Sequence, residues 1–391
     1  MNILKRRECE RLAKVDRWLL LYGRRKVGKT FALRHCVKSD FYATVTRTLE
    51  ALVGEEVWRL EDAVREAVKA LRRGGVVVLD EFQRMPEKWW DLLASAHPSG
   101  VLIISGSSFG MLRRVFDKRS PLLGLFDVVK MGLIRYADVL AQTRDFKKAA
   151  LWRDPWTIPL VYSPEEAESR IYALYLSAMG IVGEVFTEEE RTLTKLYELV
   201  LMALAEGEWN SAVVANYVSS RGALMPASTA SAYLARLAEM GLVERVPIYR
   251  SKRHYYRISS TPIRLALYAE AKYHVSEGGT PRDLPWGLEL QFNVGELVAE
   301  AKRGRLFYMP HGDVDFVVES AEGAVGYEVK AGPFTRGEAR RAVEKIRSLG
   351  LPKAGLISLA ERPPEVGDEA YGPGDLLEMS AAVFKTYSAR W

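Results

Sequence analysis

A glycine-rich run near the start of the chain has the residue types that bind phosphate. Residues 23–30 read Gly-Arg-Arg-Lys-Val-Gly-Lys-Thr, which fits the pattern G-x-x-x-x-G-K-[ST]. In such a loop the glycines let backbone N–H groups close around phosphate oxygens, and a helix N-terminus adds its positive end. Lys29 can reach the β- and γ-phosphates, and the Thr30 hydroxyl can bind Mg²⁺. We predict a site for ATP and Mg²⁺ formed by Gly23, Arg24, Arg25, Lys26, Val27, Gly28, Lys29, Thr30 and Phe31.

Two acidic residues follow the next apolar run, at 75–80. Asp80 ends that run and can join the Mg²⁺ shell, and Glu81 can accept a proton from the attacking water. A solvated strand end is the alternative for this pair. The third apolar run ends in serines, and Ser107 or Ser108 can sense the γ-phosphate, although a plain turn explains the serines equally well.

A second group of acidic residues lies near the C-terminus. Asp313-Val-Asp315 is followed by Tyr-Glu-Val-Lys at 327–330. Residues two apart on a strand share a face, so Asp315, Glu328 and Lys330 can point the same way. Two carboxylates and a lysine can hold Mg²⁺ and orient a water. A salt bridge between Glu328 and Lys330 is the alternative interpretation.

Basic residues gather in two segments of the second half of the chain. Arg250, Lys252 and Arg253 are interleaved with tyrosines, and Arg340 and Arg341 lie on an expected helix at 335–349. Basic and aromatic side chains together suit contact with the phosphates and bases of DNA. A structural module with solvated charges is the alternative.

The elements that position these residues follow from the hydrophobic pattern. Apolar runs at 18–22, 75–80 and 101–104 alternate with helices, which predicts an α/β fold with a parallel sheet. Three helices at 188–206, 211–221 and 227–240, followed by strands at 242–246 and 254–258, predict a winged helix-turn-helix. The expected domains are a P-loop ATPase core (1–135), a helical lid (136–186), a winged helix (187–262), a linker (263–285) and a smaller α/β domain (286–391).

Composition limits the class of protein. The 391 residues are 48% hydrophobic and 27% charged, as in a globular protein, and no uninterrupted apolar stretch of 18 residues indicates a membrane span. A net charge of +6 permits a nucleic-acid partner. Two cysteines and five scattered histidines make a metal site of His and Cys improbable. Scarce Gln and Asn suggest a thermophile. A cytoplasmic protein is expected.

The three motifs together resemble a known family. The segments 22–30, 79–86 and 104–111 look like those of archaeal P-loop ATPases of the AAA+-related STAND group, and 6–12 resembles the charged opening segment of those proteins, which lies near the nucleotide base. The resemblance implies an ATPase core, a helical lid, a winged helix and a C-terminal restriction-endonuclease-like domain. Carried over to the PD-(D/E)xK pattern, Asp315 and Glu328 would be metal ligands, Lys330 would position the nucleophile, and Glu296 would be an additional acid.

One departure bears on the rate of hydrolysis. Members of the family commonly carry an arginine after a Ser-Pro-Leu run as a sensor of the γ-phosphate, and Leu125 stands at that position here. An arginine finger contributes several powers of ten to the rate. Slow turnover is therefore expected unless Arg119 or a partner supplies the guanidinium.

Three functions remain open from the sequence. The first is an ATP-binding and slowly hydrolysing switch coupled to a DNA-directed nuclease domain, in DNA processing, mobile-element control or defence. The second is a STAND signalling ATPase whose C-terminal domain binds a partner without catalysis. The third is a winged-helix regulator gated by ATP. ATP or ADP and DNA are the expected partners, with a homo-oligomer or a protein partner also open.

Overall fold

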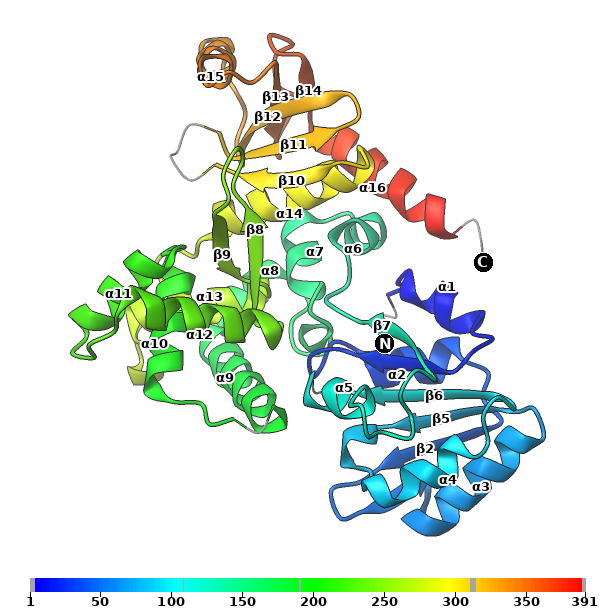
Figure 1. The fold of residues 1–391 in the computed structure, drawn as a ribbon. Helices are drawn as coiled ribbons and strands as arrows, with labels where there is room; N and C mark the ends of the chain where they lie inside the picture. Colours follow the sequence, from blue (N-terminus) through cyan, green and yellow to red (C-terminus); the bar gives the residue numbers. More distant parts are fainter. Residues whose placement is uncertain (1–3, 108, 190, 310–313, 389–391) are drawn as a thin grey trace.

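The computed structural model describes residues 4–107, 109–189, 191–309 and 314–388. A seven-stranded sheet occupies the N-terminal part, a group of helices the middle, and a five-stranded sheet the C-terminal part (Figure 1). Within the described residues, no helix is long and apolar enough to cross a membrane.

The N-terminal sheet has the strand order β4-β3-β2-β5-β6-β1-β7, and its last five strands are parallel. These five are β2 (Phe41–Val45), β5 (Val76–Asp80), β6 (Val101–Gly106), β1 (Leu19–Tyr22) and β7 (Asp127–Lys130). The predicted parallel α/β sheet is confirmed. Because β6 lies between β1 and β5, the carboxyl ends of these three strands meet at one edge of the sheet, where ligands of open α/β sheets bind.

Strands on both sides of this sheet were not predicted from the sequence. β2, β3 (Glu50–Val53) and β4 (Glu56–Arg59) on one side and β7 on the other were not predicted, and α3 (Leu60–Arg72) follows β4. β3 and β4 form a short antiparallel hairpin with charged and exposed residues, so the periodicity there is weak.

Helices cover both faces of the N-terminal sheet. One face packs α3, α4 (Trp90–Ala94) and α5 (Phe109–Val115), and the other packs α1 (Glu8–Ala13) and α2 (Lys29–Cys36). A disulfide between Cys9 and Cys36 joins α1 to α2. This disulfide was not predicted from the sequence. The two cysteines are separated by 27 residues, and this separation alone does not show that their side chains lie close together.

The middle of the chain is helical and shares one core. α6 (Tyr136–Thr143), α7 (Phe146–Trp152), α8 (Pro164–Ser169) and α9 (Ile171–Glu188) are followed by α10 (Lys195–Glu206), α11 (Ser211–Ser220) and α12 (Ala227–Glu239). A hairpin of β8 (Val243–Pro247) and β9 (His254–Ile258) follows. Three helices and a hairpin occur in the predicted order, although the first helix begins at Lys195, because residues up to Glu188 belong to α9.

The segment expected as a linker, 263–285, is largely ordered. Its first part belongs to α13 (Thr261–Tyr273), which buries Ile263, Leu265 and Leu267 in the same core as α9 and α10. The turn-forming residues that suggested a linker come only after this helix. A continuous apolar core therefore crosses the boundary that the sequence placed at residue 262.

The C-terminal sheet has the order β10-β11-β12-β13-β14. Its strands are β10 (Arg305–Tyr308), β11 (Phe316–Ser320), β12 (Gly323–Lys330), β13 (Lys353–Ser358) and β14 (Glu369–Tyr371). α15 (Arg336–Ser348) packs on one face, and α14 (Trp286–Ala301) and α16 (Pro373–Ser388) pack on the other (Figure 1). β14 and α16 were not predicted. α16 also contacts α6, so the end of the chain returns to the helical middle.

Candidate functional site

The glycine-rich loop lies between β1 and α2, as its motif requires. Gly28 has φ +92°, a left-handed conformation that favours glycine, and is the N-cap of α2. A Cβ at Gly23 would lie 1.9 Å from the Met131 carbonyl oxygen, so only glycine fits there. Lys29 is the first residue of α2, and its Nζ donates to the carbonyl oxygens of Gly23 (2.7 Å) and Arg24 (3.1 Å). The loop therefore surrounds the ammonium that would meet the phosphates.

Thr30 and Asp80 meet at the carboxyl edge of the sheet. The Thr30 hydroxyl donates to Asp80 Oδ2 at 2.6 Å, and Tyr42 and Ser105 donate to the same carboxylate. Asp80 ends β5, and its side chain is 1% exposed. Two oxygens expected to share one Mg²⁺ shell thus come together from segments fifty residues apart.

Glu81 is held in place by two neighbouring side chains. Its backbone is left-handed, with φ +57°, and its carboxylate pairs with Arg84 at 2.8 Å and accepts from Gln83 Nε2 at 2.8 Å. Gln83 also donates to Ser107 Oγ at 3.1 Å. The sequence analysis gave Gln83 no role, yet this amide joins the candidate base to the candidate sensor. Ser108 lies outside the described residues.

A cavity of about 810 Å³ opens beside the loop. Lys26, Gly28, Lys29, Thr30 and Glu81 line its polar side. Its apolar side, which the sequence analysis missed, is formed by Leu4, Ile134, Pro155, Trp156, Ile158, Pro159 and Tyr162, and Phe31 stacks on His35 at the rim. A cavity of this size, with apolar walls and a few polar groups, suits a nucleotide.

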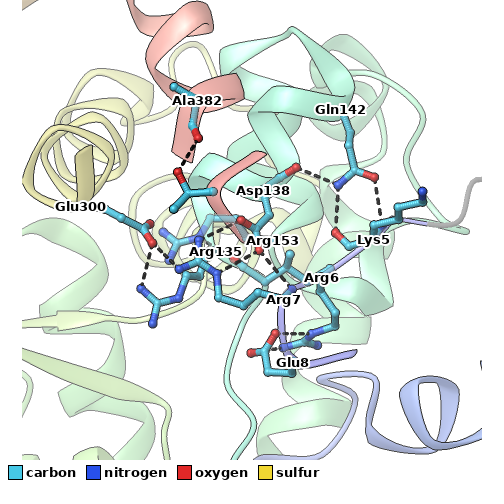
Figure 2. Close-up of polar contacts among 12 residues, drawn as sticks. Lys5, Arg6, Arg7, Glu8, Arg135, Asp138, Gln142, Arg153, Glu300 and Ala382 are labelled. Atoms are coloured by element: carbon cyan, nitrogen blue, oxygen red, sulfur yellow. Dashed lines mark hydrogen bonds and ion pairs between the residues drawn. The ribbon is translucent and has the colours of Figure 1, made fainter. Parts of the chain in front are cut away.

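The opening segment closes one end of this cavity. Arg6 is 5% exposed, and its Nη1 donates to the Val27 carbonyl at 2.7 Å while its Nη2 donates to Gly132 O and pairs with Glu8. Figure 2 shows Arg6 and Glu8 side by side below Asp138. The guanidinium thereby fixes the position of the phosphate loop through its backbone.

Two side chains of the loop and the candidate sensor Arg119 lie elsewhere than expected. The side chain of Arg24 turns away from the cavity and pairs with Asp154, so its predicted contact with the nucleotide is wrong for the side chain. Val27 is buried in the core between α1 and α2. Arg119 is exposed and is not among the residues that line the cavity, and Leu125 packs against the core of the sheet.

Two C-terminal carboxylates lie together at the start of β11. The Asp315 backbone donates to Tyr327 O at 2.9 Å, and Asp315 Oδ2 accepts from Val329 N at 2.6 Å. Burial, and then the nearby Glu328 carboxylate, raise the pKa of Asp315 to about 7. The predicted proximity of Asp315 and Glu328 is thus present. Asp313 lies outside the described residues.

The other two predicted members of this group have different partners. Lys330 pairs with Glu338 at 2.7 Å. Glu296, the additional acid that the resemblance implied, pairs with Arg153 at 2.6 Å. Gln291 is the α14 residue that reaches Asp315, and it donates to the backbone oxygen. No cluster of three or more His, Cys, Asp or Glu suited to a metal occurs among the described residues.

The basic residues of the hairpin are exposed at its tip. Arg250, Lys252 and Arg253 are exposed, as are Arg340 and Arg341 on α15. Arg250 Nη2 donates to Gly350 O at 3.2 Å, which places the tip beside the end of α15. The interleaved tyrosines instead pack inward: Tyr249 contacts Phe307, and Tyr255 contacts Phe292 and Tyr308.

Comparisons with known proteins give one domain match and several structural likenesses. Residues 15–137 match the family model of the AAA domain, and no curated protein matches the chain. The chain is similar to the Walker-type ATPase PABY2304 of Pyrococcus abyssi, with 16% identity, a TM-score of 0.48, and coverage of 68% of this chain and 96% of that one. It is also similar to the ORC2 protein of Aeropyrum pernix in its ADPNP-ADP complexes (14% identity, TM-score 0.39, 69% and 94% covered) and to the ORC1 protein of the same organism in complex with DNA (16%, 0.30, 71% and 95%).

Proposed function

We propose that this chain, which contains an AAA domain at residues 15–137, binds Mg-ATP in the 810 Å³ cavity and hydrolyses it slowly, as a switch. The observation that carries the proposal is the 2.6 Å hydrogen bond from Thr30 to Asp80 at the edge of the cavity, next to Lys29. Because the loop, the magnesium ligands and the candidate base meet at one edge, each can act on the same phosphate group.

The surroundings of Asp80 fit a divalent cation. This carboxylate is almost completely buried, and its hydrogen-bond donors in the described chain are three hydroxyls and the Glu81 N–H, all of them neutral. A buried carboxylate without a cation is costly. Thr30 and Asp80 would hold Mg²⁺, which when bound neutralises charge on the phosphate oxygens.

Each remaining residue has a definite task in this proposal. Lys29 binds the β- and γ-phosphates, and Glu81 accepts a proton from the attacking water. Arg84 and Gln83 fix the carboxylate of Glu81, and Gln83 links it to Ser107, which can contact the γ-phosphate. Proton transfer needs this fixed geometry, since acceptor and water must approach to about 3 Å.

Calorimetry with Mg-ADP tests the nucleotide site. Lys29→Ala removes the charge that balances the phosphates, so we expect affinity to fall at least tenfold, on the order of 1.5–3 kcal/mol for a charged hydrogen bond. Lys69→Ala removes an exposed lysine of α3, far from the cavity lining, and is the matched control. Equal affinity of wild type and Lys29→Ala would refute the proposal.

A second function is supported by the C-terminal carboxylates. We propose that Asp315 and Glu328 bind a divalent metal ion and that this site cleaves DNA, with Lys330 positioning the nucleophile. The supporting observation is the raised pKa of Asp315 beside Glu328, because two carboxylates that repel each other gain stability from a shared cation. The exposed basic residues at the hairpin tip and on α15 would contact the phosphate backbone.

A cleavage assay with Mg²⁺ or Mn²⁺, with and without ATP, tests this second function. Asp315→Ala should abolish cleavage, whereas Glu319→Ala, which changes an exposed acid of β11, the strand that follows Asp315, should leave it intact. DNA binding without metal-dependent cleavage would favour an ATP-gated winged-helix regulator. Absence of both would favour a signalling ATPase with a partner-binding C-terminal domain.

A further inference from the structure

Three pairs of consecutive residues lie between the phosphate loop and α14. In each pair, one residue contacts the loop directly or through one partner, and the residue adjacent to it in the chain contacts α14. The pairs are Arg6 with Arg7, Asp154 with Arg153, and Ser260 with Thr261. They come from the opening segment, the end of α7 and the start of α13, so three separate parts of the chain repeat the same arrangement.

The contacts on the loop side centre on Asp154. Its Oδ2 accepts from Arg24 Nη2 and from Ser260 Oγ, each at 2.6 Å. All three residues are buried, and Asp154 is 0% exposed. Arg24 belongs to the phosphate loop, and its carbonyl oxygen accepts from Lys29 Nζ at 3.1 Å. Lys29, which would bind the phosphates, and Arg24, which pairs with Asp154, are therefore joined by one hydrogen bond.

The Arg24–Asp154 pair is incompletely satisfied. Arg24 Nη1 and Asp154 Oδ1 are both buried and have no hydrogen-bond partner in the described part of the chain. A buried unsatisfied donor or acceptor costs about 1–3 kcal/mol. Buried unsatisfied groups are rare in native structures and call for an explanation. One functional explanation is that the Arg24–Asp154 contact rearranges when the protein works.

The contacts on the other side are spread along α14. Arg153 pairs with Glu296 at 2.6 Å and donates to Asn293, and Thr261 donates to Glu289 at 2.6 Å. Arg7 pairs with Glu300, and Figure 2 shows this arginine between Glu300 and Asp138 of α6. The four α14 residues span nearly the whole helix, and Gln291 on the same helix donates to the Asp315 backbone at 3.0 Å.

We infer that Arg24, Asp154 and Ser260 are positioning residues that couple nucleotide occupancy of the phosphate loop to α14, and through α14 to the C-terminal unit. The inference rests on the proposed ATP site and adds how nucleotide binding there would change the contacts of α14. A ligand that moves the Lys29 ammonium moves the Arg24 peptide, and Arg24 moves Asp154. Arg153, which precedes Asp154, and Thr261, which follows Ser260, then change their contacts with α14.

Hydrogen exchange of the α14 amides in the full-length protein tests this coupling. In wild type, saturating Mg-ADP or a non-hydrolysable ATP analogue should change exchange within 286–301 about fivefold or more, the range of ordinary allosteric coupling. Asp154→Asn keeps the shape but removes the charge, and should reduce the nucleotide-dependent change to less than twofold. Ser260→Ala should reduce it in the same direction. The readout is the difference made by nucleotide, which general loosening of the fold does not produce.

Two further variants serve as controls for this experiment. Asp154→Asn leaves a buried arginine charge, so the double variant Arg24→Met/Asp154→Asn removes both charges and should fold while losing the coupling. Glu168→Gln is the matched control: Glu168 contacts α14 from α8 through Trp286 at 2.6 Å but belongs to none of the three pairs, so coupling should persist.

Calorimetry on the same samples measures nucleotide binding separately from its coupling to α14. Wild type that fails to bind nucleotide would overturn the ATP site itself. Wild type that binds nucleotide without a change at α14 would overturn the coupling, as would an undiminished change in the Arg24→Met/Asp154→Asn variant.

Discussion

At the scale of single residues, the Glu81 carboxylate has the most clearly defined proposed role, which is to accept a proton from the attacking water. Its left-handed backbone and its contacts with Arg84 and Gln83 hold it at the edge of the cavity. Glu81→Gln should reduce kcat by roughly 10²–10⁴ while Mg-ATP affinity stays within about threefold, because an amide binds water but does not accept its proton. Steady-state hydrolysis together with calorimetry measures both. Unchanged turnover would require a different base.

Asp315 gives a prediction about pH at the second site. Its folded-state pKa, raised by burial and by Glu328 to about 7, exceeds its ordinary value of 3.8. The folded protein therefore binds this proton more tightly than the unfolded chain, and ionisation destabilises the fold as pH rises from about 4 to 7. Asp315→Asn should raise Tm at pH 8 and leave it nearly unchanged at pH 4. Thermal unfolding at both values checks this, and an equal shift at both would contradict it.

Metal binding should follow the same ionisation. A divalent cation needs the deprotonated carboxylate, so Mn²⁺ affinity at Asp315 and Glu328 should fall as pH decreases through about 7. Titration of Mn²⁺ at pH 6 and pH 8, monitored by its electron paramagnetic resonance signal, measures this. The Asp315→Asn variant is the control, in which the pH dependence should disappear.

At the scale of elements, the disulfide between Cys9 and Cys36 joins two helices next to the cavity. It closes a loop with a separation of 27 residues, which in the chain-entropy model stabilises the fold by roughly 3.5 kcal/mol. Reductant should lower the free energy of unfolding by an amount of this order. In Cys9→Ser the reductant should have no further effect. Two titratable thiols in the folded, unreduced protein would contradict the bond.

At the scale of the whole molecule, Glu289 links the C-terminal unit to the helical middle. It is completely buried on α14 and accepts from Arg264, Arg257 and Thr261 at 2.6–3.1 Å. Burial by itself raises the pKa of Glu289, but the charges of Arg257 and Arg264 outweigh it, so the pKa lies below its ordinary value. Glu289→Gln leaves two buried arginines short of a counter-charge and should cost about 3–5 kcal/mol of stability. Denaturant unfolding measures this.

The depressed pKa of Glu289 also predicts acid sensitivity. Its contribution to stability is present above about pH 4.5 and is lost as pH falls through the lower folded-state value. Wild type should therefore lose stability in this range, and Glu289→Gln should show a flatter profile. Parallel slopes for the two proteins would show that other carboxylates govern acid unfolding.

The sequence by itself determined the parts of this protein whose chemistry depends on consecutive residues. The phosphate loop at 23–30 and the pair Asp80-Glu81 were predictable, because a strand, a glycine-rich turn and a helix N-terminus are adjacent in the chain and each leaves a local pattern. The parallel sheet followed from the same apolar runs. The proximity of Asp315 and Glu328 was predictable for a related reason, since residues on neighbouring strands of a hairpin are constrained by register.

Only the tertiary structure decided which distant residues meet these groups. The apolar wall of the cavity comes from Leu4, Ile134 and the segment 155–162, and its members share no sequence pattern. Arg24 was predicted to contact the nucleotide, and its side chain forms an ion pair with Asp154, 130 residues away. Glu296 forms an ion pair with Arg153. The direction of the Glu296 side chain depends on how α14 is rotated in the core. That rotation is set by burial of the whole apolar surface, which no local spacing specifies.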